Sequence, residues 1–86
     1  MPTSAPDEGA RARSVRVTAT RLVVALVDGR EISTPLDWYP RLRRATPSQR
    51  RRWRLIGGGL GIHWPGVDED LSVDGMLRGI QAGRER

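Results

Sequence analysis

The chain has 86 residues, a formal net charge of +5 and no cysteine, and all fifteen of its basic residues are arginines. A chain of this length forms one domain, and without cysteine it has neither disulfides nor a thiolate zinc site to stabilise a small core. No apolar run approaches the roughly 20 residues that span a bilayer, and no signal peptide is recognisable at the N-terminus. We therefore expect a cytoplasmic bacterial protein that contacts no membrane.

Both ends of the chain differ in composition from its middle. Residues 1–12 are polar and non-periodic and contain proline and glycine, which predicts a disordered tail. Residues 13–80 are expected to form the single domain. Residues 81–86 are expected to form a frayed C-terminal tail.

The first part of the domain predicts a three-stranded antiparallel meander. Alternating apolar residues over 14–19 indicate a half-exposed strand, and the uniformly apolar run 22–27 is typical of a central strand covered on both faces. Asp28-Gly29 favours a two-residue hairpin in which both central residues take positive φ. Residues 30–34 return as the third strand.

The middle of the chain predicts two short helices. Asp37 can cap the first, over residues 38–44. The segment Thr46–Gln49 supplies an N-cap threonine, a proline at the first helical position and a capping-box glutamine. We expect this second helix to run to about Ile56 and to end at Gly57, a favoured C-terminal residue.

Seven arginines lie between Arg41 and Arg54, with no acidic residue among them. At 100° per residue, Arg50, Arg51 and Arg54 fall opposite Trp53 on the second helix, so they should form an exposed stripe. Such a field attracts phosphate backbones or an acidic partner, although a charge run is also typical of a solvated helix face. The candidate partner-binding residues are Arg43, Arg44, Arg50, Arg51 and Arg54, with Trp38 and Tyr39 as the nearby aromatic residues able to stack on a base.

The last part of the domain predicts a fourth strand and a final helix. Residues 60–64 alternate so that His63 points outward, and Asp70 or Ser72 can cap a helix over about residues 73–80. The result is an α+β fold with a small antiparallel sheet, a three-stranded meander plus a fourth strand, and two or three short helices. Its predicted centre comprises Leu22, Val24, Leu26, Ile32, Leu42, Trp53, Ile62, Trp64 and Leu77.

His63 and the acidic turn after it raise the question of catalysis. A general base needs an acid partner and a pocket, and the sequence shows neither directly. We expect His63, Asp68 and Asp70 to shape the turn, with a hydrogen bond from His63 to one of the two aspartates. The acidic residues 68–70 can also cap the last helix and interact favourably with its N-terminal dipole.

The glycine run Gly57–Gly61 does not fit a phosphate-binding loop. A Walker loop needs a preceding strand and a Gly-Lys-Ser/Thr sequence that opens a helix, whereas here a helix should precede and no lysine exists. We expect a helix C-cap and a flexible connection instead. The sequence thus predicts no cofactor, no metal site and no catalytic residues.

Several motifs together resemble the domain of unknown function 2442 family. They are the Asp-Gly-Arg turn at Asp28, the segments PLDWYPRL and ATPSQR, and the run GIHWPGVDEDLSVDGML that starts at Gly61. The resemblance spans about residues 15–79. It implies a small α+β fold with a curled antiparallel sheet and no established activity. Relatives often neighbour proteins of the domain of unknown function 4160 family, and the pairs look like toxin–antitoxin modules.

Two functions therefore remain open. The first is a non-enzymatic protein-binding module, the antitoxin-like or regulatory partner of a domain of unknown function 4160 neighbour. The second is a nucleic-acid-binding protein driven by its arginines. Residues 65–86 carry five acidic and three basic side chains, a net charge of −2, which could pair with the arginines within the chain or in a homodimer.

Overall fold

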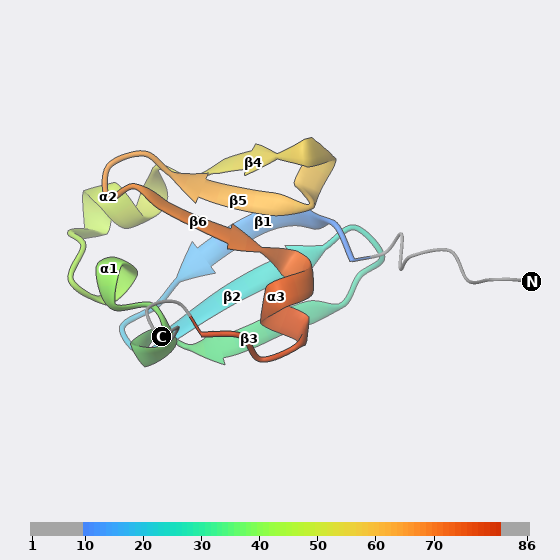
Figure 1. Cartoon of the computed structure of the whole chain (residues 1–86), viewed down its shortest axis with the longest axis horizontal. Coiled ribbons are helices and arrows are strands. Elements are labelled where there is room, and N and C mark those ends of the chain that lie inside the picture. The colour runs from blue at the N-terminus through green and yellow to red at the C-terminus, as the bar shows by residue number, and fades with distance from the viewer. Residues whose placement is uncertain (1–9, 82–86) are drawn as a thin grey trace, which may run out of the picture.

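The computed structural model describes residues 10–81 as two antiparallel three-stranded sheets with short helices between and beside them (Figure 1). The first sheet has the order β1–β2–β3, and the second has the order β4–β5–β6. The α+β class is confirmed, but the predicted single sheet with a fourth strand is divided into two sheets. The strands are β1 (Ala12–Val17), β2 (Arg21–Leu26), β3 (Glu31–Pro35), β4 (Arg54–Ile56), β5 (Gly61–Trp64) and β6 (Glu69–Ser72).

The helical segments are all short. Three are α-helices, and two are single 3-10 turns. They are η1 (Leu36–Trp38), α1 (Pro40–Arg43), α2 (Pro47–Arg51), η2 (Gly57–Gly59) and α3 (Val73–Leu77).

The fold begins earlier in the chain than the composition suggested. Ala10 and Ala12, which we assigned to the N-terminal tail, are both buried, and the Arg11 carbonyl accepts a hydrogen bond from Val27 N at 2.9 Å. Small apolar residues that pair with a neighbouring strand belong to the domain even in a polar segment. The remaining tail residues, 1–9 and 82–86, lie outside the described residues.

The β2–β3 hairpin has a different turn from the predicted one. Leu26 N donates to Arg30 O at 2.8 Å, and Gly29 N donates to Leu26 O at 3.1 Å, so the loop contains three residues. Gly29 alone takes positive φ, while the Asp28 carboxylate accepts the Arg30 N–H at 3.0 Å. This is the pattern of a three-residue loop with one left-handed residue.

Helix α2 begins as predicted and ends five residues early. Its capping box is complete, with Thr46 Oγ1 accepting from Gln49 N at 3.0 Å and Gln49 Oε1 accepting from Thr46 N at 2.9 Å. The chain leaves the helix at Arg52, and β4 pairs with β5 through Leu55 and Ile62. Strand pairing therefore overrides the helical continuation, and neither Trp53 nor Arg54 lies on the helix.

The other two capping expectations have mixed outcomes. Asp37 caps neither η1 nor α1, since Pro35 and Tyr39 occupy those N-cap positions. Ser72 caps α3 by accepting from Gly75 N at 2.8 Å. Residues 68–70 do not cap this helix, because Ser72 occupies its N-cap position.

Residues from both sheets meet in one core. Six of the nine predicted central residues are buried, while Ile32 and Trp53 are partly buried against the core. The prediction that Leu77 lies in the core is wrong, because this side chain is 45% exposed. Helix α3 buries Val73 and Met76 instead. The core cluster comprises Ala10, Ala12, Leu22, Val24, Leu26, Leu36, Tyr39, Leu42, Ile62, Trp64, Val73 and Met76.

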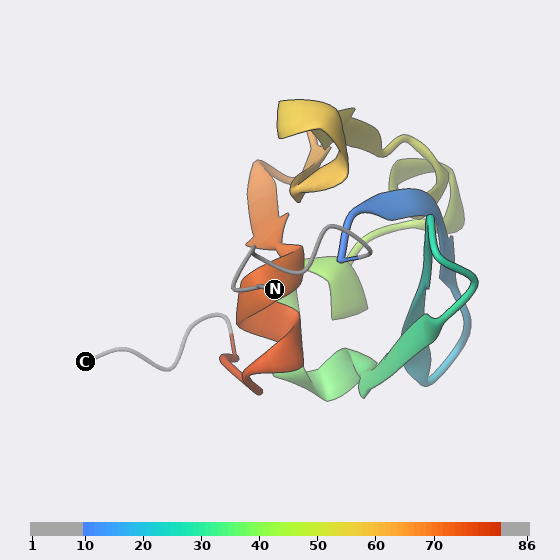
Figure 2. The same ribbon diagram turned by 90° about the vertical axis from the view of Figure 1, so that its right-hand side faces the viewer.

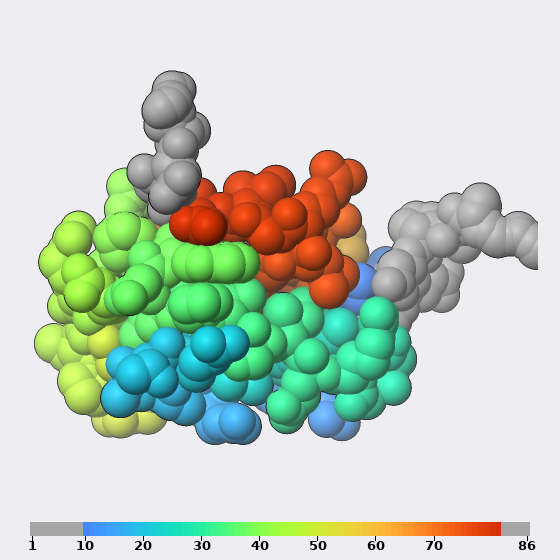
Figure 3. Space-filling model, turned by 90° about the horizontal axis from the view of Figure 1, so that it is seen from below, coloured from blue at the N-terminus to red at the C-terminus, as the bar shows by residue number. Residues whose placement is uncertain are grey.

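The two sheets face each other across this core and have different neighbours at their edges (Figure 2). Helix α3 contacts both β3 and β6, and it therefore bridges one pair of edges. Its end lies beside the η1–α1 segment (Figure 3). Just beyond the helix, a Cβ placed on Gly79 would stand 4.0 Å from the Trp38 ring. On the other pair of edges, β1 is contacted by η2 and α2.

Candidate functional site

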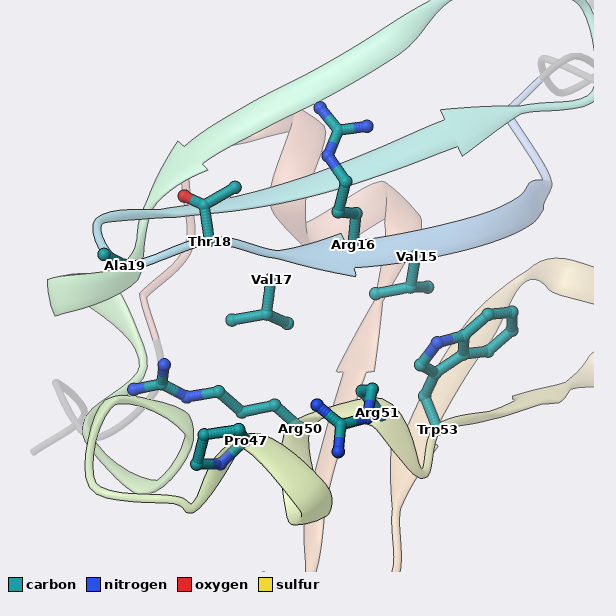
Figure 4. Close-up of a pocket in the computed structure, with 9 residues that line it drawn as sticks. All are labelled: Val15, Arg16, Val17, Thr18, Ala19, Pro47, Arg50, Arg51 and Trp53. Carbon is teal, nitrogen blue, oxygen red and sulfur yellow. The ribbon is translucent and has the colours of Figure 1, made fainter.

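An open groove lies between β1 and α2 (Figure 4). Its volume is about 660 Å³. The side chains of Val15 and Val17 point from β1 toward α2, while Arg16 and Thr18 extend to the other side of the strand. The lining residues are Val15, Arg16, Val17, Thr18, Ala19, Pro47, Arg50, Arg51 and Trp53.

The local sequence holds the α2 side of this groove in place. Pro47 occupies the first turn of α2, and the Thr46–Gln49 capping box satisfies backbone groups at the helix start. After the helix, Trp53 packs partly against the core and closes one end of the groove. The apolar surface of the groove thus comes from two elements that are more than 25 residues apart.

Arg50 has a structural role that the sequence did not indicate. Its Nε donates to Leu42 O at 3.0 Å and its terminal nitrogen donates to Arg43 O at 2.7 Å, so the side chain ties α2 to the end of α1. The Arg50 carbonyl accepts from Trp64 Nε1 at 3.1 Å. Arg50 therefore lines the groove while its guanidinium is already occupied.

The remaining predicted arginines do not form a stripe on one helix. Arg51 lies on α2 and Arg54 on β4, and both are exposed. Arg43 lies 3.5 Å from Asp37 in an ion pair at the surface, and Arg44 is exposed at the end of α1. Of the predicted set, the structure brings only Arg50 and Arg51 to the groove.

The predicted stacking aromatics do not lie in the groove either. Tyr39 is fully buried in the core, which corrects its assignment to a binding surface. Trp38 is partly buried and meets Tyr39 edge-on, with ring centroids 6.3 Å apart. The aromatic residue that lines the groove is Trp53, which sequence reasoning placed in the centre of the core.

Sequence reasoning missed the β1 side of the groove. The signal was present in the alternation of Val15 and Val17 with polar residues, which we interpreted as a half-exposed strand and not as part of a binding site. An edge position cannot be recognised from that alternation, because strand order depends on distant pairing. The groove is cationic, since Arg50 and Arg51 line it from α2 and no acidic residue does so among the described residues.

His63 and Asp70 form the interaction that we expected. His63 Nδ1 hydrogen-bonds to Asp70 Oδ1, and the two residues are Cα partners in the β5–β6 pair. The contact joins two strands on an outer face of the second sheet. It stands apart from the groove and holds the hairpin together.

Asp68 shapes the turn through its backbone. It is the one residue other than glycine with positive φ in the described chain, at 55°. Its carbonyl accepts from the Arg41 guanidinium at 2.6 Å. An aspartate tolerates this left-handed conformation better than most residues do, which explains its place in the turn.

Three residues with polar side chains, Thr34, Tyr39 and Glu69, are buried, and the sequence analysis did not predict this. Glu69 is 6% exposed, and burial raises the pKa of its carboxyl, with Arg41 lowering it and Asp70 and Asp68 raising it further. Burial also raises the pKa of Tyr39, an effect that Glu69 increases and Thr34 reduces.

The inward position of Glu69 could have been found from period-two alternation in the last strand. Glu69 lies opposite the fully buried Trp64, while Asp70 lies opposite the partly exposed His63. The Thr34 and Tyr39 hydroxyls are buried without a hydrogen-bond partner among the described residues.

Two features are absent from residues 10–81. No group of three or more histidine, aspartate or glutamate side chains there lies close enough to hold a metal ion. Within the same range, no helix is long and apolar enough to cross a membrane.

Two solved structures are similar to this chain over most of its length. A crystal structure of a protein of unknown function from Rhodospirillum rubrum ATCC 11170 is 30% identical, with a TM-score of 0.73 over 86% of this chain and 92% of that one. The solution NMR structure of an uncharacterized protein from Chromobacterium violaceum is 29% identical, with a TM-score of 0.72 over 86% of this chain and 70% of that one. No curated protein matches the chain.

A family model agrees with the motifs quoted above. It matches residues 12–82, from the start of β1 to just beyond α3, and its description is protein of unknown function (DUF2442). This range contains both sheets, the groove and the His63–Asp70 contact. The chain belongs to the DUF2442 family.

Proposed function

We propose that this protein is a non-enzymatic module that binds another protein, as the antitoxin-like or regulatory partner in a toxin–antitoxin type gene pair. The observation that carries the proposal is the groove between β1 and α2. Val15, Val17 and Trp53 give it an apolar surface, and Arg51 adds a cation that pairs with no described residue. Aromatic residues and arginine are enriched where proteins bind one another.

The chemistry of the groove favours binding over catalysis. Proton transfer in an active site needs a group such as an imidazole or a carboxylate within hydrogen-bond reach of the substrate. The described residues that line the groove contribute hydroxyl, guanidinium, indole and aliphatic groups instead. The family resemblance adds a candidate partner, the product of a neighbouring gene of the domain of unknown function 4160 family.

Co-expression with the product of the adjacent gene tests the proposal. We expect a complex that co-elutes in size-exclusion chromatography and that relieves growth inhibition by the neighbour. Arg51→Glu should weaken the complex, because a carboxylate replaces an unpaired cation in the groove. Arg78→Glu is the matched control. Arg78 follows α3, does not line the groove, and forms an ion pair with Asp74 at 3.1 Å. Absence of a complex together with unchanged growth inhibition would overturn the proposal.

Nucleic-acid binding is the second candidate, and a separate observation favours it. Arg51, Arg52 and Arg54 are all exposed around Trp53, an indole that could stack on a base. With three phosphate contacts, affinity for a single-stranded oligonucleotide should fall about 20-fold between 50 and 200 mM salt. Fluorescence anisotropy would measure this, and affinity that does not depend on salt would eliminate the candidate.

A further inference from the structure

One edge of the first sheet has backbone groups that face the groove. Directly after β1, Thr18 N donates to Arg21 O at 2.9 Å, and the register within β1 pairs Arg16 with Val23. Hydrogen-bonded and non-hydrogen-bonded pairs alternate along antiparallel strands. The N–H and C=O groups of Val15 and Val17 therefore point away from β2, toward the free edge.

This free edge is covered at one end and open in the middle. Near its start, Gly59 of η2 lies so close to β1 that a Cβ on it would stand 2.6 Å from Ala12 O. Beyond the register shift between Ala12 and Ser14, the groove lies between β1 and α2. The outward backbone groups of Val15 and Val17 thus lie beside the groove, whose lining side chains are drawn in Figure 4.

The charges around this edge select the chemistry of the occupant. Arg13 and Arg16 on β1 and Arg51 on α2 are exposed and pair with no described residue. Val15, Val17 and Trp53 form an apolar surface on the groove side, whereas the Arg16 side chain extends to the other side of β1. Side chains of an added strand alternate between two faces, so acidic and apolar residues in turn would match both features.

We propose that the groove binds an extended acidic segment of a partner protein, which adds to the first sheet as a fourth strand beside β1. The inference rests on the proposed protein-binding function and names the form in which the partner is recognised. Backbone hydrogen bonds to Val15 and Val17 give affinity, as in other cases of strand addition. The arginines at the rim select against neutral and basic segments.

The first test uses a synthetic peptide of eight residues that alternates glutamate with valine. In 15N-labelled protein, we expect the Val15 and Val17 amides to gain protection from hydrogen exchange and the Trp53 indole signal to shift. A matched peptide with lysine in place of glutamate should bind more than tenfold more weakly. A third peptide, N-methylated at alternate amides, keeps every side chain and removes the backbone donors on one edge, and it should bind about fivefold more weakly per lost bond.

A protein variant tests the same contact from the other side. Val17→Pro removes the outward N–H without removing a bond to β2, and proline is tolerated on an edge strand at such a position. We expect about fivefold weaker peptide binding with an otherwise preserved amide spectrum. The N-methylated peptide keeps the test decisive if this variant does not fold.

Several results would overturn the inference. They are no binding at about 1 mM peptide, equal affinity for the acidic and lysine peptides, and equal affinity for the N-methylated peptide. Displacement of the peptide by an oligonucleotide that binds more tightly would assign the groove to nucleic acid. Concentration-dependent protection of Val15 and Val17 without peptide would assign the edge to a second copy of this chain.

The co-expressed neighbour separates this inference from the proposed function. If the neighbour binds Val17→Pro and the native chain equally well, protein binding stands and strand addition is overturned. If the acidic peptide binds as described and the neighbour does not, strand addition stands and the assignment to the gene pair is overturned.

Discussion

Arg50 and Arg51 are adjacent arginines on one short helix, and they have different roles. Arg50 donates to two backbone carbonyls at the end of α1, whereas Arg51 is exposed and makes no described pair. The sequence gives both residues the same charge and the same helical face. Only the position of α1, set by tertiary packing, separates a structural arginine from one that is available to a ligand.

Arg50→Gln should lower the free energy of unfolding by about 2 kcal/mol, because hydrogen bonds from a charged donor to two carbonyls are lost. Arg51→Gln is the matched control and should change it by less than about 0.5 kcal/mol. Urea denaturation followed by circular dichroism measures both values. Equal effects of the two substitutions would contradict the structural role of Arg50.

At the same scale, sequence reasoning succeeded where the determinant was local or strictly periodic. The capping box at Thr46 and the cap at Ser72 were predicted because each needs only residues three positions apart. The His63–Asp70 contact was expected, although it joins paired strands. Tyr39 was misplaced, since nothing nearby in the sequence indicates that its ring enters the core.

Among the elements, η2 determines how much of the β1 edge stays open. Its Gly59 has a φ of 101° and lies against the Ala12 backbone, so both conformation and space require glycine. Gly29 has a similar φ of 95° but nothing lies within 4 Å of the position of its Cβ. Substitution of Gly29 therefore introduces backbone strain alone, whereas substitution of Gly59 adds a steric clash.

Gly59→Ala should cost about 3 kcal/mol or more, and Gly29→Ala only about 1 kcal/mol, because both introduce strain but the first also displaces β1. Thermal unfolding measures the difference. The Gly59→Ala variant should also change the amide signals of β1, and a spectrum altered no more than that of Gly29→Ala would show that η2 does not hold this edge.

The elements also show why helix α2 was predicted too long. Nothing in the run from Arg51 to Ile56 breaks a helix, so local propensity allowed it to continue. Residues 54–56 instead form an edge strand because β5 supplies a partner for them. That partner lies beyond the Gly57–Gly59 turn, and a prediction made from spacing alone did not include it.

For the whole molecule, the division into two facing sheets has a cost at neutral pH. It places Glu69 against the core, where burial raises the pKa of its carboxyl. A raised pKa means that the folded state holds this proton more tightly than the unfolded state does. Stability from this group is therefore lost as the pH rises from near the ordinary value of 4.5 through the raised pKa.

Glu69→Gln should raise the free energy of unfolding at pH 7 and flatten its decline over this pH window. Glu31→Gln serves as the control, because Glu31 is exposed on β3. Urea titrations at several pH values between about 4 and 8 measure the slope. If the free energy of unfolding of Glu69→Gln falls with pH as steeply as that of the native chain, another group dominates the pH dependence.

The same architecture gives the protein two kinds of intrinsic fluorophore. Trp64 is fully buried and donates its indole N–H to the Arg50 carbonyl, so its emission reports whether the core and the end of α2 are intact. Trp53 lines the groove, and its emission should respond to whatever enters there. Occupancy and unfolding can thus be followed in one unlabelled sample, with Trp53→Phe leaving only the signals of Trp64 in the core and of Trp38 packed against it.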